Sequence, residues 1–375
     1  MASKGDSTRS VHAGLPPAKQ GEPILPGPAM AAPFHLQGDP ADSPYGYTRE
    51  DNPTFANYEA AVGELEGGRA LAFGSGMAAL TAVALVNLRP GDTLVAPADG
   101  YPVLRATAES YLRPRGIEVR LVPTDDDALL GAVEGARLVM LETPSNPRLD
   151  VCDIERIAAA AHEHGAIVAV DNTLATPLGQ PVLDLGADLS VVAGTKALTG
   201  HGDLLIGHVA TRDDALLAPL RAWRASTGAV PGPFETWLAH RSLATLALRL
   251  ERQCANALAI AEALDADART GVVRYPGLPG DPAHATAKRQ MRAYGPLVSF
   301  ALSNRATAEA FLAGCELVAD ATSFGGVHTT AERRARWGHG DDVPEGFIRL
   351  SAGIEDSADL LSDIERGMAA AADRA

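Results

Sequence analysis

Short apolar runs alternate with helical stretches between about residues 55 and 210, and this alternation constrains the fold more than any other feature. The runs are ALAFGSG (70–76), TLVAP (93–97), EVRLVP (118–123), RLVMLET (137–143), AIVAVDN (166–172) and LSVVAG (189–194). Apolar strands separated by helices indicate a largely parallel sheet with both faces covered. We therefore predict an α/β fold.

The rest of the chain divides into an arm, a helical link and a smaller unit. Residues 1–47 are rich in Pro and Gly and show no sustained period, which predicts an extended arm. Residues 234–264 are amphipathic and contain neither Pro nor Gly, which predicts a helical link between two domains. The predicted domains are the arm (1–47), a large domain (48–247) and a smaller C-terminal α+β domain (248–375).

Composition and charge exclude several classes of protein. Hydrophobic residues make up 46% of the 375 and charged residues 21%, which allows a real core. The formal net charge of −15 opposes binding to nucleic acid or an anionic membrane, because both require concentrated positive charge. No apolar run approaches the roughly 20 residues of a membrane span, and MASKGDSTRS lacks the hydrophobic region of a signal peptide. We expect a soluble cytoplasmic protein that acts on small molecules.

The three cysteines give no sign of a disulfide framework or a metal site. Cys152, Cys254 and Cys315 are scattered, lack metal-ligand spacing and cannot all pair within one chain. We therefore expect reduced, structural cysteines and no bound metal.

Gly-rich residues follow the first predicted strand. Ligands in open α/β folds bind outside the carboxyl ends of the strands. Gly74, Ser75 and Gly76 occupy that place, and a helix is expected to begin near Met77. Backbone N–H groups at a helix start, approached through glycines, form a site suited to phosphate. A tight turn made from small residues is the alternative interpretation.

Asp171 and Lys196 end two later strands. Taken singly, such an aspartate is commonly an N-cap or turn former, and such a lysine is commonly a solvated loop residue. A phosphate cradle, an aspartate and a lysine on strand ends together favour pyridoxal phosphate. The lysine would form the Schiff base, and the aspartate would keep the pyridine nitrogen protonated.

Longer motifs extend this interpretation, and the chain resembles the Cys/Met metabolism family of pyridoxal-phosphate enzymes. That family contains cystathionine γ-lyase, cystathionine γ-synthase, methionine γ-lyase and O-acylhomoserine sulfhydrylases. The matching segments run from YGYTREDNPT at 45 to FIRLSAGIEDSADLLSDIE at 347, and include SGMAA, ETPSNPRLDVCDI, VDNTLATP, GTKALTGHGD and RLSAGIED. The resemblance implies a type I pyridoxal-phosphate fold, similar to aspartate aminotransferase, in a homotetramer of two catalytic dimers.

The resemblance also implies roles for residues around the cofactor. Lys196 resembles the Schiff-base lysine, and Gly76 and Met77 would donate backbone N–H groups to the phosphate. Thr195 would add a side-chain contact to the phosphate. Tyr101 would stack on the cofactor ring and exchange a proton with the amino group or the leaving sulfur.

Further residues are implied at the subunit boundary and the substrate. Tyr47 and Arg49 resemble the pair that reaches the phosphate of the neighbouring subunit, a task for which the planar fork of Arg is suited. Asn146 would contact the ring hydroxyl of the cofactor and the substrate carboxylate region. Ser323 and Arg349 resemble the residues that hold that carboxylate. Taken singly, each could be a surface salt bridge, a turn residue or a core aromatic.

The chain departs from the family in four places. Val192 and Ala193 stand where the family usually has His-Ser, which removes a hydroxyl expected at the phosphate. Val103 stands where methionine γ-lyases typically carry a cysteine, and Thr322 where cystathionine enzymes commonly have Glu. The segment 328–342 differs from the usual run, which predicts a shifted distal pocket.

We expect a lyase that cleaves L-cystathionine to L-cysteine, 2-oxobutanoate and ammonia. Lys196 would move protons from Cα and Cβ, and Tyr101 would assist departure of the thiol. The first alternative is γ-replacement on an activated homoserine, as in cystathionine γ-synthase or a sulfhydrylase. The second alternative is a methionine γ-lyase. A non-catalytic cofactor carrier would not need Tyr101, Ser323 or Arg349, and the chain has all three. The motifs leave elimination and replacement undecided.

Overall fold

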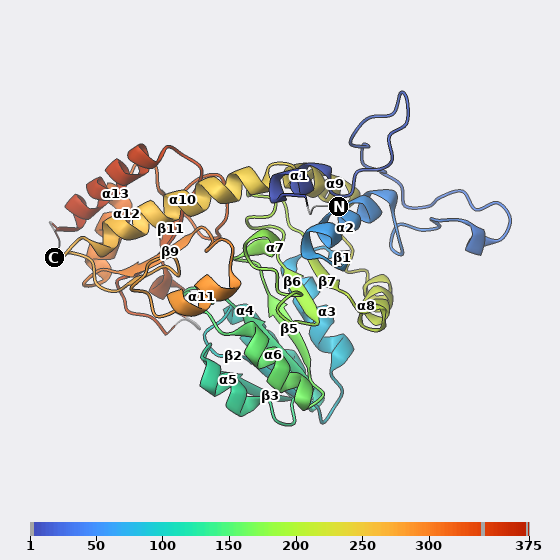
Figure 1. The fold of residues 1–375 in the computed structure, drawn as a ribbon, viewed down its shortest axis with the longest axis horizontal. Coiled ribbons are helices and arrows are strands. Elements are labelled where there is room, and N and C mark those ends of the chain that lie inside the picture. The colour runs from blue at the N-terminus through green and yellow to red at the C-terminus, as the bar shows by residue number, and fades with distance from the viewer. Residues whose placement is uncertain (1–3, 339–341, 373, 375) are drawn as a thin grey trace.

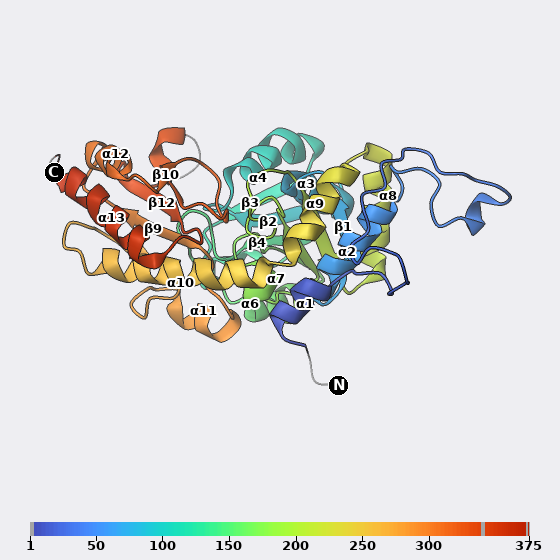
Figure 2. The same ribbon diagram turned by 90° about the horizontal axis from the view of Figure 1, so that it is seen from above.

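Two β-sheets with their own helices lie side by side, and helix α10 (Leu246–Asp265) runs from one to the other (Figure 1). The structure is a computed structural model that describes residues 4–338, 342–372 and 374. The large sheet and the N-terminal arm occupy one end of the molecule. The small sheet and the C-terminus occupy the other end (Figures 1 and 2).

The large sheet has seven strands in the order β1-β7-β6-β5-β4-β2-β3. Strand β7 is antiparallel to both of its neighbours, and every other adjacent pair is parallel. The prediction of a largely parallel sheet is therefore confirmed. The strands are β1 (Arg69–Phe73), β2 (Thr93–Pro97), β3 (Glu118–Val122), β4 (Leu138–Glu142), β5 (Ile167–Asp171), β6 (Leu189–Val192) and β7 (Gly207–Thr211).

Helices cover both faces of this sheet, which explains why its strands are apolar throughout. In β5, Ile167 and Ala169 pack into the core on one face, and Val168 and Val170 into the core on the other. The first face carries α3 (Gly76–Asn87), α4 (Pro102–Thr107), η2 (Ala108–Leu112), η3 (Arg113–Arg115) and α8 (Asp214–Thr227). The second carries α2 (Pro53–Glu66), α5 (Asp126–Ala132), α6 (Ile154–Glu163), α7 (Thr176–Gly179) and α9 (Pro233–Leu243).

The small sheet has five strands in the order β10-β11-β12-β9-β8 and is antiparallel except for the β10–β11 pair. The strands are β8 (Val273–Arg274), β9 (Leu297–Ala301), β10 (Ala319–Asp320), β11 (Thr330–Arg333) and β12 (Phe347–Ser351). Its helical elements are α11 (His284–Gln290), α12 (Arg305–Gly314), η4 (Arg334–Trp337) and α13 (Ser357–Ala372). This arrangement confirms the smaller α+β unit.

The helical link of residues 234–264 forms two helices rather than one. Helix α9 ends at Leu243 and α10 begins at Leu246, with Thr245 at the junction. The Thr245 hydroxyl donates to the carbonyl of Ser242 at 3.3 Å and so satisfies a carbonyl at the end of α9. The domain boundary between 247 and 248 falls in the first turn of α10 and stays a prediction.

The prediction of an extended arm over residues 1–47 is wrong for its first part. Residues Asp6–His12 form helix α1, which packs against α2 and α10. Arg9 donates to the carbonyls of Glu64 at 2.6 Å and Leu65 at 2.9 Å, so tertiary contacts with the end of α2 stabilise a helix too short to be stable alone. The later arm loops away from the body, with one 3₁₀ turn, η1 (Pro40–Asp42) (Figure 1).

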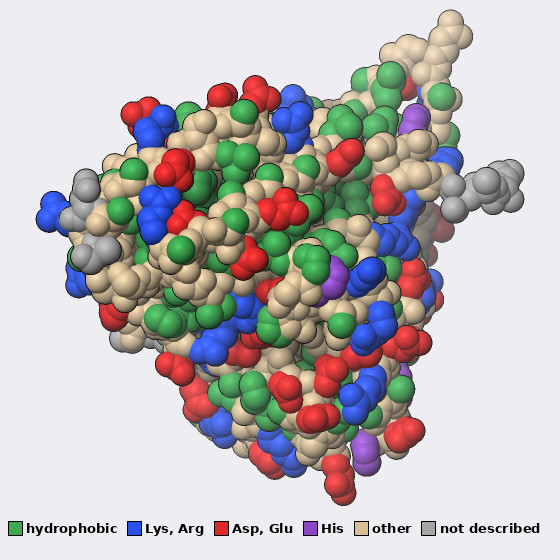
Figure 3. All heavy atoms as spheres, turned by 60° about the vertical axis from the view of Figure 1, so that its left-hand side comes forward, with side chains coloured by type: hydrophobic (Ala, Val, Ile, Leu, Met, Phe, Trp, Pro, Cys, Tyr) green, Lys and Arg blue, Asp and Glu red, His purple; other side chains and the backbone are tan. Residues whose placement is uncertain are grey.

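The surface and the cysteines agree with the composition. No helix in the described ranges is long and apolar enough to cross a membrane. On the face shown in Figure 3, acidic and basic side chains are interspersed. Cys152, Cys254 and Cys315 are free thiols. Burial raises the pKa of Cys152 to about 12, which fits a structural role.

Candidate active site

The carboxyl ends of β4, β5 and β6 open into a cavity of about 410 Å³ that the small sheet closes from the other side. A cavity of this size suits a small-molecule ligand. Nine of the predicted site residues line it: Gly76, Met77, Tyr101, Asn146, Asp171, Thr195, Lys196, Ser323 and Arg349. The fold therefore brings together residues that lie far apart in the sequence.

Helix α3 begins at Gly76, one residue before the expected start, and points its N-terminus at the cavity. The Ser75 hydroxyl caps the helix by accepting the N–H of Ala78 at 3.1 Å. A Cβ at position 76 would collide with Ala193, so only glycine lets the helix start lie against the loop after β6. The N–H groups of Gly76 and Met77 precede the first hydrogen bond within the helix, and suit an anion.

Asp171 ends β5 as a half-buried carboxylate at the floor of the cavity. Burial raises its pKa, although hydrogen bonds from Thr173 and the charge of Lys196 act in the opposite direction. The N–H of Thr173 donates to Asp171 Oδ1 at 3.0 Å and fixes the carboxylate. An aspartate with a raised pKa gains stability from a cationic partner, such as a protonated ring nitrogen.

Glu142 stands beside Asp171, because the two residues are register partners in β4 and β5. Its carboxylate accepts the N–H of Tyr101 at 2.6 Å and the N–H of Asn146 at 3.1 Å. It thereby ties the loop before α4 to the loop after β4. A Cβ on Gly100 would come within 2.6 Å of Glu142 Oε2, which explains a glycine before Tyr101. Burial and the charge of Asp171 raise the pKa of Glu142 to about 8.

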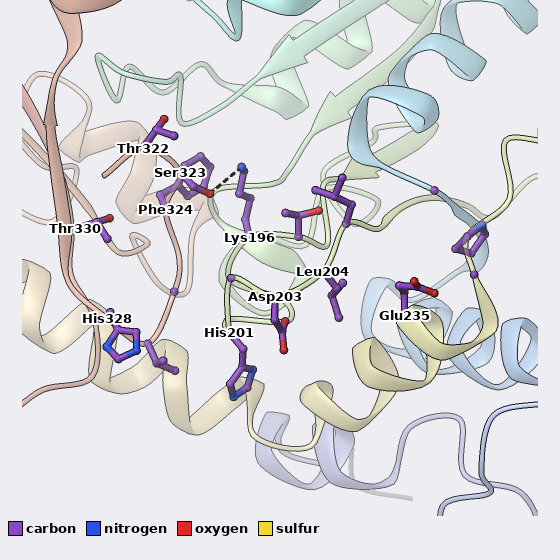
Figure 4. A pocket seen from close by; sticks show the side chains of 18 of the residues that line it. Lys196, His201, Asp203, Leu204, Glu235, Thr322, Ser323, Phe324, His328 and Thr330 are labelled. Carbon is purple, nitrogen blue, oxygen red and sulfur yellow. Dashed lines mark hydrogen bonds between the residues drawn. The ribbon is translucent and has the colours of Figure 1, made fainter. Parts of the chain in front are cut away.

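Lys196 reaches across the cavity from the large sheet to the small one. Its Nζ donates to Ser323 Oγ at 3.0 Å and lies 5.3 Å from the centre of the Phe324 ring (Figure 4). Burial lowers the pKa of Lys196, and Arg349 lowers it further, whereas Asp171 and Glu332 have the opposite effect. The pKa of the amine is thus shifted toward the range where a lysine acts as a nucleophile or base.

Arg349 of β12 lines the small-sheet side of the cavity, and Glu332 of β11 is its register partner. Arg349 donates to Asn146 Oδ1 at 2.7 Å, to the Ser323 carbonyl at 3.0 Å and to Glu332 Oε1 at 2.5 Å. These bonds hold Ser323 in the left-handed region, with φ of 80°, which residues other than glycine seldom adopt. Burial alone would raise the pKa of Glu332, but Arg349, Trp337 and Arg334 outweigh burial and lower it.

A threonine hydroxyl lies beside Ala193, where the family resemblance implies a serine. The N–H of Ala193 donates to Thr173 Oγ1 at 2.8 Å, and this hydroxyl lines the same cavity. Thr195 Oγ1 donates to the carbonyl of Ile206 at 3.2 Å and accepts its N–H at 3.0 Å. Thr173 therefore joins Thr195 as a hydroxyl within the cavity wall.

Tyr47 and Arg49 are the two predicted residues that the fold does not bring to this cavity. Tyr47 is 46% exposed, and Arg49 donates to the carbonyl of Ala225 in α8 at 2.7 Å. A second cavity of about 860 Å³ opens on the other side of Lys196, between the loop 201–205, the start of α9 and residues 322–328 (Figure 4). Its described lining does not include these two residues either.

These groups fit pyridoxal phosphate at each part of the molecule. The N-terminus of α3 suits its phosphate, the Asp171 carboxylate suits its ring nitrogen, and Lys196 has the amine that its aldehyde requires. All three lie around one cavity, so a single ligand can meet them together.

Comparison with known proteins agrees with the geometry. The family model of the Cys/Met metabolism PLP-dependent enzymes matches residues 7–369. The chain belongs to this family. It is therefore a pyridoxal-phosphate-dependent enzyme with the type I fold, and it acts on small amino acids of cysteine and methionine metabolism as a lyase or a synthase.

Individual relatives carry out different reactions. A Streptomyces coelicolor protein described as "Putative cystathionine gamma-lyase" is 57% identical over 372 residues, covering 97% of this chain and 93% of that protein. The L-methionine gamma-lyase of Pseudomonas deceptionensis is 36% identical over 393 residues, covering 98% of each. The solved cystathionine gamma synthase of Xanthomonas oryzae pv. oryzae, in complex with aminoacrylate and cysteine, aligns over 100% of both chains with a TM-score of 0.96 and 34% identity.

Sequence reasoning missed four residues that shape this site, namely Glu142, Thr173, Glu332 and Arg334. Glu142 and Thr173 lie inside motifs that were recognised, ETPSNP and VDNT, and each follows or precedes a predicted strand end. Both residues lie at or just after the carboxyl end of a strand, where ligands bind in open α/β folds, and this position was the available signal. Glu332 and Arg334 lie in the segment 328–342, of which positions 339–341 fall outside the described residues.

Proposed function

We propose that the protein is a cystathionine γ-lyase, which converts L-cystathionine and water to L-cysteine, 2-oxobutanoate and ammonia. The observation that supports this most is the place of Lys196, whose amine lies between the Asp171 carboxylate and the Ser323–Arg349 pair in one cavity. A base in that place lies next to Cα and Cβ of an amino acid held by its carboxylate. The 57% identical relative supports cystathionine as the substrate.

We propose that Arg349 holds the α-carboxylate. Its planar fork can bind both carboxylate oxygens, and its bonds to Glu332 and the Ser323 carbonyl fix its direction before substrate arrives. Asn146 Oδ1 already accepts from Arg349 Nη1, so its amide group lies at the same place. A carboxylate bound here would lie beside the Lys196 amine.

We propose that Lys196 moves the protons. When bound, pyridoxal phosphate supplies an electron sink for the charge that develops as Cα and then Cβ lose protons. The lowered pKa of Lys196 leaves more of its amine neutral at a given pH, and a neutral amine can accept those protons. Ser323 Oγ, which accepts from Nζ at 3.0 Å, keeps the amine directed into the cavity.

We propose that Tyr101 protonates the leaving thiol. Its ring lines the cavity and is 38% exposed, so the hydroxyl can approach a sulfur that projects from Cγ. Glu142 fixes the Tyr101 backbone by accepting its N–H, which positions the ring.

Product analysis tests the function. Purified enzyme should release cysteine and 2-oxobutanoate in equal amounts from L-cystathionine, and should release less 2-oxobutanoate from methionine, homocysteine or O-acylhomoserine. Adding cysteine to the O-acylhomoserine reaction distinguishes replacement from elimination. Rapid formation of cystathionine there, with slow cystathionine cleavage, would contradict the lyase and favour a γ-synthase.

We also propose that Tyr47 and Arg49 serve the active site of a neighbouring subunit, within a cytoplasmic homotetramer of two catalytic dimers. Both lie outside the cavities that border Lys196 in their own chain, which supports the proposal. Coexpression of an Arg49→Ala chain with a Lys196→Ala chain tests it. In a mixed dimer one site would receive both changes and the other neither, so activity should reappear. Mixtures no more active than the two parents together would refute the shared site.

A further inference from the structure

A second arginine, Arg334, lines the cavity that contains Lys196 and Arg349. It begins η4 directly after strand β11 and is only 7% exposed. Arg334 donates to Glu332, and Glu332 is the register partner of Arg349 in the β11–β12 pair, so Arg334 lies near Arg349. The register of β11 with β12 thus places two arginines at one end of the cavity.

Glu332 bridges the two arginines. The same oxygen, Oε1, accepts from Arg334 Nη1 at 2.7 Å and from Arg349 Nη2 at 2.5 Å. Its other oxygen, Oε2, accepts from Trp337 Nε1 at 2.8 Å and from Arg336 Nη2 at 3.4 Å. Glu332 is itself buried, so it holds both guanidinium groups in fixed positions.

A single carboxylate does not account for two arginines in one cavity. The α-carboxylate of an amino acid needs one guanidinium fork, and under the proposed function that fork is Arg349. Arg334 Nη1 donates to Glu332, and a guanidinium, which carries five N–H donors, can serve more than one acceptor at a time. Thr322, which also lines the cavity, is neutral and donates to Glu332 Oε1 at 3.3 Å.

We propose that Arg334 binds a distal carboxylate of the substrate, so that the site selects amino acids with a carboxylate at each end. The inference rests on the proposed function for the place of the first carboxylate at Arg349. L-Cystathionine and O-succinylhomoserine have a distal carboxylate, whereas methionine and O-acetylhomoserine do not. Arg334 is thereby a specificity-determining residue of this site.

Binding of two unreactive amino acids tests the inference without assuming which reaction the enzyme performs. L-2-aminosuberate and L-2-aminooctanoate have the same carbon chain and no leaving group, and differ in a distal carboxylate or methyl. Their dissociation constants are measured on the holoenzyme from the change in cofactor absorption. Arg334→Gln should weaken aminosuberate binding about 10- to 100-fold, the range expected for a lost charge-assisted hydrogen bond. Aminooctanoate binding should change less than about 3-fold, because its chain end makes no charged contact.

Arg336→Gln is the matched control. Arg336 also donates to Glu332, but it is not among the cavity residues, so its removal should leave both dissociation constants within about 2-fold. Arg334→Lys should restore part of the aminosuberate affinity, because it keeps the charge without the fork. The cofactor absorption of each variant before titration shows whether the site has remained folded.

The outcomes separate this inference from the proposed function. Equal weakening of both ligands by Arg334→Gln would overturn the inference, because it would show a purely structural role through Glu332. No weakening of either ligand would also overturn it. Selective loss of aminosuberate in an enzyme that does not cleave cystathionine would support Arg334 and refute the γ-lyase. Turnover of O-succinylhomoserine and O-acetylhomoserine by both forms then shows whether the same preference governs catalysis.

Discussion

The carboxylates at the two walls of the active-site cavity have pKa values that are shifted in opposite directions. The large-sheet wall includes Gly76, Asp171 and Lys196, and the pKa of the half-buried Asp171 is raised. The small-sheet wall includes Ser323 and Arg349, and the pKa of Glu332, a buried carboxylate that accepts a hydrogen bond from Arg349, is lowered. Burial raises the pKa in both cases, and the difference comes from the arginines beside Glu332.

This difference shows what each wall is ready to bind. A carboxylate whose pKa is raised gains stability from an added cation, which suits the ring nitrogen of the cofactor. A carboxylate already surrounded by arginines positions those arginines for an added anion, which suits a substrate carboxylate. Under the proposed function, the large-sheet wall would therefore face the cofactor and the small-sheet wall the substrate.

Removing Lys196 should have the largest effect, because its amine is the only one that the proposed mechanism uses on the large-sheet wall. Lys196→Ala should lower kcat at least about 1,000-fold and remove the visible absorption of lysine-bound cofactor. Lys288→Ala, an exposed lysine of α11, is the control and should keep both. Normal turnover by Lys196→Ala would refute the division between the walls, since the cofactor would then bind elsewhere.

Arg349→Lys should damage the small-sheet wall alone. It keeps the charge but loses the fork, so kcat/KM should fall about 10- to 100-fold while cofactor absorption stays unchanged. The same substitution at Arg305, an exposed residue of α12, should leave kcat/KM unchanged. If Arg349→Lys instead releases cofactor, the small-sheet wall also holds the cofactor, and the two walls do not have separate roles.

Glu142→Gln should reveal the raised carboxylate pKa values of the large-sheet wall through stability. The folded-state pKa of Glu142, about 8, exceeds the ordinary value of 4.5, so its contribution to stability is complete below the ordinary pKa and is lost as pH rises through about 8. The melting temperature of the cofactor-free protein should therefore fall between about pH 5 and about pH 8, and this contribution should level off above that. Glutamine cannot ionise, so the variant should reduce that fall by at least about 2 °C.

The control for this experiment is Glu309→Gln, an exposed residue of α12, which should leave the wild-type slope unchanged. An equal fall in wild type and Glu142→Gln would show that Glu142 is already ionised in the folded state. The carboxylate pKa values at the two walls would then differ less than we infer.

Ala193→Ser should have the smallest effect. A hydroxyl at this position adds one hydrogen bond to a charged phosphate, so cofactor should leave a few-fold more slowly during dialysis. Thr173, whose hydroxyl already lies against the Ala193 N–H, limits the gain. Unchanged or faster loss would mean that Thr173 fills the place of the missing serine, or that the sequence match is shifted here.

Much of the large-sheet wall could be predicted from the sequence. Each of its residues lies at or within a few residues of the carboxyl end of an apolar strand, and the carboxyl ends of parallel strands meet at one edge of a sheet. Gly76, Asp171 and Lys196 could therefore be grouped before the strand order was known. The start of α3 differed by a single residue, because Ser75 provides the cap.

The small-sheet wall was predicted only in part, and from family resemblance alone. Arg349 and Ser323 matched family motifs, but nothing in the local sequence around Glu332 and Arg334 indicates that they face Arg349. That contact depends on the antiparallel register of β11 with β12. A shift of one residue in this register would turn the Glu332 side chain to the other face of the sheet, away from Arg349.

The N-terminal arm also contains a structure that its local sequence does not indicate, helix α1. Residues 6–12 have no helical signal strong enough to act alone, yet Arg9 finds carbonyls at the end of α2 and a helix forms there. Short helices depend on tertiary contacts, which a local pattern does not contain.

By itself, the sequence determined the α/β class, the strand ends that carry chemistry and the residues that suit pyridoxal phosphate, because apolar periodicity and strand-end residues are local properties. Only the tertiary structure decided that Glu142 ties Tyr101 to Asn146, that Glu332 bridges two arginines, and that Tyr47 and Arg49 lie away from their own Lys196. Those facts depend on strand register and on which surfaces meet, and both are set by long-range packing.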